Sequence, residues 1–115
     1  MKTMEIQEII QALEDSKKTL DQLTIQLANA SKERNIKELE YNKKIQVEIE
    51  KARQEGIQVT LIKDIVKSRL AELMFELNMA TSKETFFNNR LKDERANIEI
   101  LRTILSYQKE QIKLV

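Results

Sequence analysis

The sequence has no proline, no cysteine, no histidine and no tryptophan, and it has a single glycine in 115 residues. Hairpins and tight loops need residues that adopt left-handed or fixed backbone angles, so this chain has little means of building a sheet. The abundant residues are helix formers together with isoleucine, a composition typical of long helices and coiled coils. The length is that of one domain. We therefore expect a single all-α domain over residues 1–115.

The missing residue types also exclude most catalytic and metal-binding chemistry. Without cysteine and histidine the chain has no thiol nucleophile, no thiolate zinc site and no imidazole base, and one glycine cannot build a phosphate-binding loop. Glu84 and Glu94 are unusual because they fall on the apolar side of a predicted helix. Paired acids or ligands of a hard cation are one interpretation, but a polar layer opposite lysine or arginine is favoured. We expect no enzyme activity, no catalytic residue, no metal, no cofactor and no small-molecule substrate.

Charge and hydropathy give no indication of a membrane protein. Twenty basic and nineteen acidic residues leave a net charge of +1, and the two signs alternate along the chain. The longest apolar run, residues 73–75, is far shorter than the roughly 20 residues that a spanning helix needs. The N-terminal stretch MKTMEIQEIIQALED lacks the apolar core of a signal peptide. We expect no association with a membrane.

Apolar residues recur at helical spacing on both sides of the glycine, which predicts one helix over about residues 3–55 and a second over about 61–113. The stripe of the first helix is Ile6, Ile9, Leu13, Leu20, Leu23, Leu27, Ala30, Tyr41, Ile45, Ile49 and Ala52, interrupted at Ser16, Arg34 and Glu38. The second helix carries a heptad seam of Val66, Leu70, Leu73, Leu77, Ala80, Glu84, Phe87, Leu91, Glu94, Ile98, Leu101, Leu105, Gln108 and Ile112. A capping-box pattern at TSKE allows a break near residues 79–82, but the unbroken phase of the seam favours one continuous helix.

The single glycine, Gly56, is predicted to form the turn between the two helices, over residues 56–60. Just past the end of a helix, a left-handed conformation costs glycine nothing, and Ile57 can then fold back onto Ala52. Thr60 is expected to offer its hydroxyl to the first free amides of the second helix. A connection of this length is normal between antiparallel helices, so we predict a long, coiled-coil-like helical hairpin.

The second helix has a further apolar register that a simple hairpin leaves uncovered. It recurs every seven residues, and six of its eight positions are apolar, the eight being Ile65, Glu72, Met79, Phe86, Asp93, Ile100, Tyr107 and Leu114. Burying one large apolar side chain contributes about 1.5–3 kcal/mol, so a row of them favours association. We expect a homo-oligomer, most simply a dimer of hairpins forming a four-helix bundle. The predicted association face consists of Ile65, Met79, Phe86, Ile100, Ile104 and Tyr107.

One stretch of the second helix, FFNNRLKDERANIEILR, supports an alternative in which the protein binds nucleic acid. Arg90, Lys92, Arg95 and Arg102 accompany aromatic and amide side chains there, a combination that can hold phosphates and stack on bases. The competing interpretation, which we prefer, is a solvated face whose charges are neutralised by the acidic residues of the same stretch.

The stretches EGIQVTLIKDIVKSRLAELMFELNMA and ERANIEILRTILSYQKEQIKL resemble small helical proteins encoded by bacteriophages and mobile elements of Gram-positive bacteria. The resemblance implies a small cytoplasmic protein that acts by binding another macromolecule, as an accessory factor or as an inhibitor of a host protein. Together with the residue patterns, it leads us to expect a non-enzymatic protein–protein interaction module that self-associates and binds a protein partner. A nucleic-acid accessory protein is the alternative.

Overall fold

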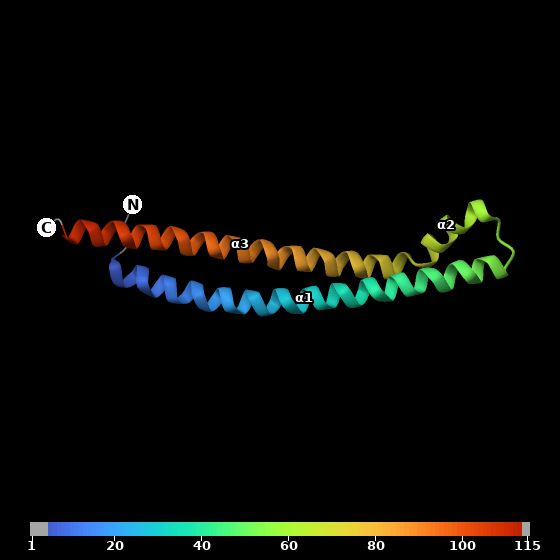
Figure 1. Ribbon diagram of the computed structural model, residues 1–115, viewed down its shortest axis with the longest axis horizontal. Helices are drawn as coiled ribbons and strands as arrows, with labels where there is room; N and C mark the ends of the chain where they lie inside the picture. The colour runs from blue at the N-terminus through green and yellow to red at the C-terminus, as the bar shows by residue number, and fades with distance from the viewer. Residues whose placement is uncertain (1–4, 114–115) are drawn as a thin grey trace. The chain divides into compact units, whose positions relative to one another are not determined.

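The computed structural model describes residues 5–113, which form three helices and no strand. They are α1 (Ile6–Gln54), α2 (Val59–Arg69) and α3 (Ala71–Lys113) (Figure 1). This confirms the expected all-α fold, whereas the expected helix start near residue 3 lies outside the described residues. The chain divides into two compact units, unit 1 (Met1–Leu27 with Phe86–Val115) and unit 2 (Ala28–Thr85).

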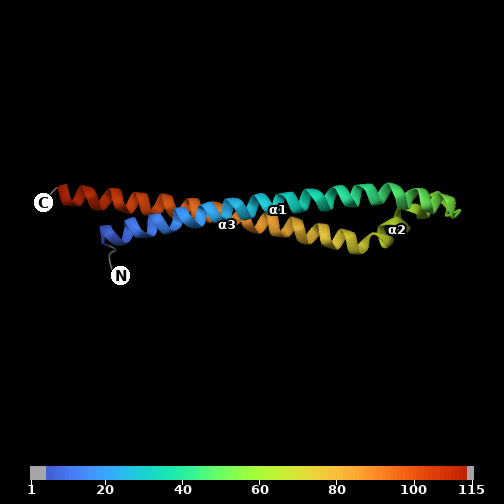
Figure 2. The same ribbon diagram turned by 90° about the horizontal axis from the view of Figure 1, so that it is seen from below.

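Unit 1 is built from the first part of α1 and the last part of α3, which lie side by side in both views (Figures 1 and 2). Its core consists of Ile9, Leu13, Ile98 and Leu101, flanked by Ala12, Leu20, Ile104 and Leu105. The interruption of the stripe at Ser16 is also buried, and its Oγ accepts a hydrogen bond of 2.9 Å from Nδ2 of Asn97 on α3. Because a buried hydroxyl without a partner would be destabilising, this bond makes a polar residue tolerable within the core.

Unit 2 contains the turn at Gly56, which has the predicted left-handed conformation with φ +77°. The Gly56 N–H donates to the carbonyl of Arg53 and the Ile57 N–H to that of Ala52, both at 3.1 Å. These are the two bonds of a Schellman motif, which satisfies carbonyls at the end of α1. Ile57 also packs against the core cluster of this unit, which consists of Ala52, Ile62, Val66 and Leu70. The predicted helix stop and the folding back of Ile57 are therefore confirmed.

The predicted capping role of Thr60 is wrong. Residue 58 precedes the first helical residue, and no side chain caps the helix there. Gln58 has an extended backbone (φ −56°, ψ 138°), and its carbonyl accepts a bond of 2.9 Å from the Leu61 N–H. Helix α2 begins at Val59, one residue before Thr60, and the connection covers residues 55–58 rather than 56–60.

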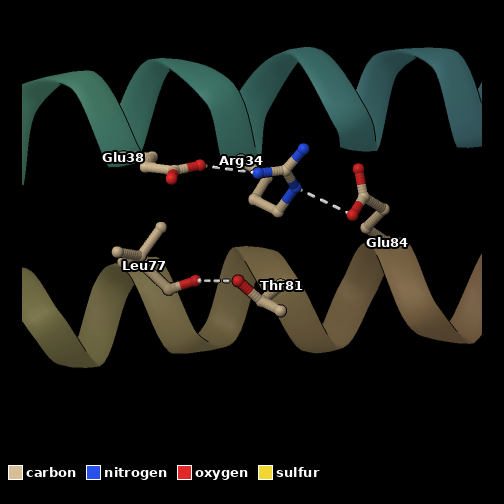
Figure 3. Close-up of polar contacts among 5 residues, drawn as sticks. All are labelled: Arg34, Glu38, Leu77, Thr81 and Glu84. Carbon is tan, nitrogen blue, oxygen red and sulfur yellow. Dashed lines mark hydrogen bonds and ion pairs between the residues drawn. The ribbon is translucent and has the colours of Figure 1, made fainter.

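The prediction of one continuous helix over about residues 61–113 is wrong, because this part of the chain is interrupted at Leu70. The optional break near residues 79–82 does not occur, and α3 is continuous there. The Thr81 hydroxyl donates to the Leu77 carbonyl at 2.9 Å within α3, so it does not cap a new helix (Figure 3). Leu70 has φ −100° and ψ 10° and is buried against α1, and the preceding Arg69 binds the carboxylates of Glu48 in α1 and Glu55 just after it. The break therefore coincides with tertiary contacts of α2, since no glycine or proline lies nearby.

The two apolar patterns read from the sequence line the contact between the helices in each unit. Every residue of the α1 stripe is buried or half-buried, and so is every residue of the heptad seam except Ile112. The polar members of the seam, Glu84 and Glu94, are half-buried. The 3.6-residue periodicity of the sequence thus identified the packed faces correctly.

Replacing Gly56 with alanine should lower the free energy of unfolding by about 1 kcal/mol. A Cβ at this position would meet no atom within 4 Å, so the whole cost arises from the left-handed backbone. Gly56→Asn should cost less, because asparagine tolerates this conformation better. Urea unfolding followed by circular dichroism measures both variants. Equal stability of the alanine variant and the wild type would contradict the conformation described for the turn.

Candidate functional site

A polar layer joins α1 and α3 in unit 2, around Arg34 (Figure 3). Its Nε donates to Oε1 of Glu84 at 2.8 Å, and its Nη1 donates to Oε2 of Glu38 at 2.7 Å. The side chains of Arg34 and Glu84 are only 27% and 24% exposed. Glu84 therefore lies opposite an arginine, which confirms the polar-layer interpretation of this seam residue. Glu94, the other unusual carboxylate, belongs to unit 1.

Hydrogen bonding lowers the pKa of Glu84 below its ordinary value, with Ser31 as the largest cause and Arg34 as the next. The same contact with Glu84 raises the pKa of Arg34. Both groups are thus held in their charged forms around neutral pH, which suits an ion pair and not a proton-transfer group. Within residues 5–113, no group of three or more acidic side chains is arranged to hold a metal ion.

Two further ion pairs connect α1 and α3 on either side of this layer. Lys37 Nζ lies 3.1 Å from Oε2 of Glu76, and Lys83 Nζ lies 3.2 Å from Oε2 of Glu33. Both pairs are largely exposed, so each contributes little to stability. Their sign pattern nevertheless disfavours a slip of one helix past the other, because a shift of one turn would separate the partners.

The polar layer should make stability depend on acidic pH. A carboxylate whose pKa is lowered in the folded state stabilises it above the pKa of the unfolded chain, and this contribution is lost as the pH falls through the folded value. We expect the melting temperature of the wild type to drop below about pH 4.5, the ordinary glutamate value. In Glu84→Gln the melting temperature should be lower at pH 7 and should fall less on acidification.

Thermal melts at pH 7 and pH 3 measure this difference between the two proteins. Glu14→Gln, which removes an exposed carboxylate of α1 in unit 1, controls for the change in charge alone. Glu55 also has a lowered pKa, caused first by its hydrogen bond with Arg69, so some acid sensitivity should persist in Glu84→Gln. A pH dependence identical to that of the wild type would contradict the role given to Glu84.

The predicted association face is only partly exposed. In unit 1, Phe86, Ile100 and Tyr107 of α3 are 56%, 59% and 65% exposed, whereas Ile104 is half-buried against the core. In unit 2, Met79 is 57% exposed, and Ile65 of α2 is half-buried. Phe75, which is 65% exposed, lies one turn before Met79. Leu114, the last member of the register, lies outside the described residues.

The four basic residues proposed to contact nucleic acid are all exposed on α3 in unit 1. Arg102 Nη1 forms an ion pair of 3.0 Å with Glu99, whereas the other three have no carboxylate within 4.0 Å among residues 5–113. At about 100° per residue, Arg95 and Arg102 lie about 20° apart and Lys92 about 60–80° from them, whereas Arg90 points at least about 120° away from all three. The four side chains therefore do not form one continuous basic strip.

Two apolar hollows lie between helices, and neither was predicted. One of about 880 Å³ lies in unit 1, where Ile6 of α1 faces Ile104 and Tyr107 of α3. The other, of about 540 Å³, lies in unit 2 between α1 and α2, and we call it the α1–α2 groove. Ile45, Ile49 and Ile62 line its floor, and Arg53, Lys63 and Lys67 surround it. The sequence could not reveal this groove, because it depends on how α2 packs against α1, and the pattern of either segment alone does not give that packing.

Comparison of the chain with protein-family models, with curated protein sequences and with solved structures gives no match. Across residues 5–113, none of the helices combines the length and the apolar character required to cross a membrane.

Proposed function

We propose that this protein is a non-enzymatic helical interaction module that self-associates through the exposed apolar residues of α3 and binds a protein partner. The observation that carries the proposal is the exposure of Phe86, Ile100 and Tyr107 in unit 1, each by more than half of its surface. They occur at intervals of fourteen and seven residues, so they share one side of a helix that already packs its other side against α1.

The energetics favour covering these residues. Burying one large apolar side chain contributes about 1.5–3 kcal/mol, and several of them acting together can offset the entropy that association costs. Soluble monomers rarely expose contiguous apolar patches of large size. Two copies that meet through α3 would form a four-helix bundle with the α3 helices at its centre. The outer surface of the bundle would then be free for a partner, consistent with an accessory factor or inhibitor from a bacteriophage or mobile element.

Sedimentation equilibrium tests the self-association directly. The wild type should be dimeric at tens of micromolar, and the double variant Ile100→Lys/Tyr107→Lys should be monomeric at the same concentration, because two charges would have to be buried. Ile25→Lys is the matched control, since Ile25 is 63% exposed but belongs to α1. The control should remain dimeric. A wild type that stays monomeric at this concentration would refute self-association.

A nucleic-acid accessory role has one observation in its favour, namely that Arg90, Lys92 and Arg95 are exposed and have no carboxylate partner within residues 5–113. Against it, Arg90 lies on a different side of α3 from Lys92 and Arg95. Capture of partners from a bacterial lysate, with and without nuclease, separates the two functions. A gel shift at low salt that weakens steeply as salt is added would favour nucleic-acid binding, and no shift at low salt would eliminate it.

A further inference from the structure

The contact between α1 and α2 in unit 2 is bridged by ion pairs on one side and has a groove open to solvent on the other. On the closed side, Arg69 of α2 reaches both Glu55 at 2.7 Å and Glu48 at 3.5 Å. On the open side lies the α1–α2 groove, with a volume of about 540 Å³. Among residues 5–113, only α1 and α2 line this groove, and its apolar floor is open to solvent.

The groove is both apolar and positively charged. Val59, on its edge, is 85% exposed, the largest exposure of any bulky apolar residue within 5–113. Lys63 and Lys67 have no carboxylate within 4.0 Å among the described residues, and Arg53 has only Glu50 at 3.9 Å. A suitable occupant therefore carries apolar side chains beside a negative charge.

The same unit carries a surface with the opposite charge. At the start of α3, Phe75 and Met79 are 65% and 57% exposed and lie one turn apart on the same side. Glu72 lies one turn before Phe75 and is exposed, with no basic group within 4.0 Å among residues 5–113. Glu76, by contrast, is bound by Lys37 at 3.1 Å. We call Glu72, Phe75 and Met79 the acidic strip.

We propose that the acidic strip of one copy of this chain docks into the α1–α2 groove of a second copy, with Phe75 and Met79 over the floor and Glu72 against Lys63 and Lys67. Because the two surfaces belong to the same unit, two copies can exchange this contact in both directions around a twofold axis. The inference rests on the proposed self-association and deepens it, since it assigns a groove, a strip and a charge pair to the interface. It also accounts for the unpaired charges and for the exposure of Val59.

Mixing two variants with opposite charge reversals tests the contact. Lys63→Glu/Lys67→Glu makes the groove repel Glu72, and Glu72→Lys makes the strip repel the lysines, so each variant alone should dimerise at least about tenfold more weakly than the wild type. In an equimolar mixture, the acidic groove of the Lys63→Glu/Lys67→Glu variant can bind the basic strip of the Glu72→Lys variant. The unchanged groove of the second variant can bind the unchanged strip of the first. The mixture should therefore form a heterodimer with nearly the affinity of the wild type.

Sedimentation velocity at low salt measures all of these species, and circular dichroism verifies that each variant is folded. Lys17→Glu/Lys18→Glu and Glu14→Lys make the same charge changes on exposed positions of α1 in unit 1, and both should dimerise like the wild type.

Two results would overturn the docking but leave the self-association intact. One is that the groove and strip variants dimerise as strongly as the wild type, and the other is that their mixture dimerises no more strongly than each variant alone. A monomeric wild type would refute the self-association and the docking together. A monomeric wild type that binds dodecanoate through Lys63 and Lys67 would instead identify the groove as a site for a small anionic amphiphile.

Discussion

Replacing Ile9 with alanine should lower the free energy of unfolding by about 2–5 kcal/mol, the largest effect we expect from a single substitution. Ile9 has an exposed fraction of 0%, and no other large side chain among residues 5–113 is completely buried. It lies at the centre of the unit 1 core, where it packs with Leu13 of α1 and with Ile98 and Leu101 of α3. Truncation removes buried methyl groups of Ile9 and leaves a cavity between α1 and α3, which the two helices cannot easily close.

The neighbouring residue provides a matched control for this experiment. Ile10 has the same side chain and the same helical backbone but is 37% exposed, so Ile10→Ala should cost about 1 kcal/mol or less. Urea unfolding of both variants, at the same protein concentration as the wild type, measures the difference. The concentration has to be fixed because association also stabilises the folded chain. Similar losses for the two variants would show that unit 1 does not pack as described.

Ala52→Leu should be the second most damaging change, with a loss of about 1–3 kcal/mol. Ala52 is fully buried where α1 meets α2, and its small side chain lets Ile62, Val66 and Leu70 approach. A leucine there would have to displace α2 or adopt an unfavourable rotamer. The α1–α2 groove would be altered as well, because two of its lining residues, Ile62 and Val66, belong to the same cluster.

The control for this substitution is Ala28→Leu, at an exposed position of α1 in the same unit. Both changes introduce a leucine into a helix, and leucine and alanine have similar helix propensities. Ala28→Leu should therefore leave the urea midpoint nearly unchanged. If Ala52→Leu proved equally neutral, α2 would not be packed tightly against Ala52, and the description of this contact would be wrong.

The structure was easiest to predict where a residue type or a sequence pattern is compatible with only one local structure. Gly56 is the only glycine in the sequence, and glycine adopts a left-handed backbone without strain, so the end of α1 and the Schellman motif followed from its position. The apolar stripe and seam were equally clear, because a period of 3.6 residues over many turns has no other simple explanation. Helix content and packed faces were predictable for this reason.

For polar residues within the packed faces, the sequence predicted the type of partner but not which residue it is. The seam position of Glu84 indicated a basic partner, yet naming Arg34 requires the register between α1 and α3. Ser16 was recognised only as an interruption, although Asn97 satisfies it across the core. Such partners depend on how two distant segments align, and the sequence of each segment alone does not encode this alignment.

The break at Leu70 had no local signal in the sequence. Leucine is a strong helix former, and the seam continues in phase through residue 70. The interruption accompanies the burial of Leu70 and the double contact of Arg69 with Glu48 and Glu55, which are tertiary interactions. The capping box near residue 82 was a local signal without such support, and α3 continues through it. At both sites, the local sequence pattern alone did not indicate whether the helix ends.

Because α2 is short, we expect it to unfold locally before the long helices do. Eleven residues are too few for a helix to persist in water without support, and non-helical residues separate α2 from the long helices at both of its ends. Its amide protons are therefore protected from exchange with solvent only while it stays docked on α1. In unit 2, α2 would thus undock and unfold as a small cooperative segment at a lower free energy than the long helices, without global unfolding of the chain.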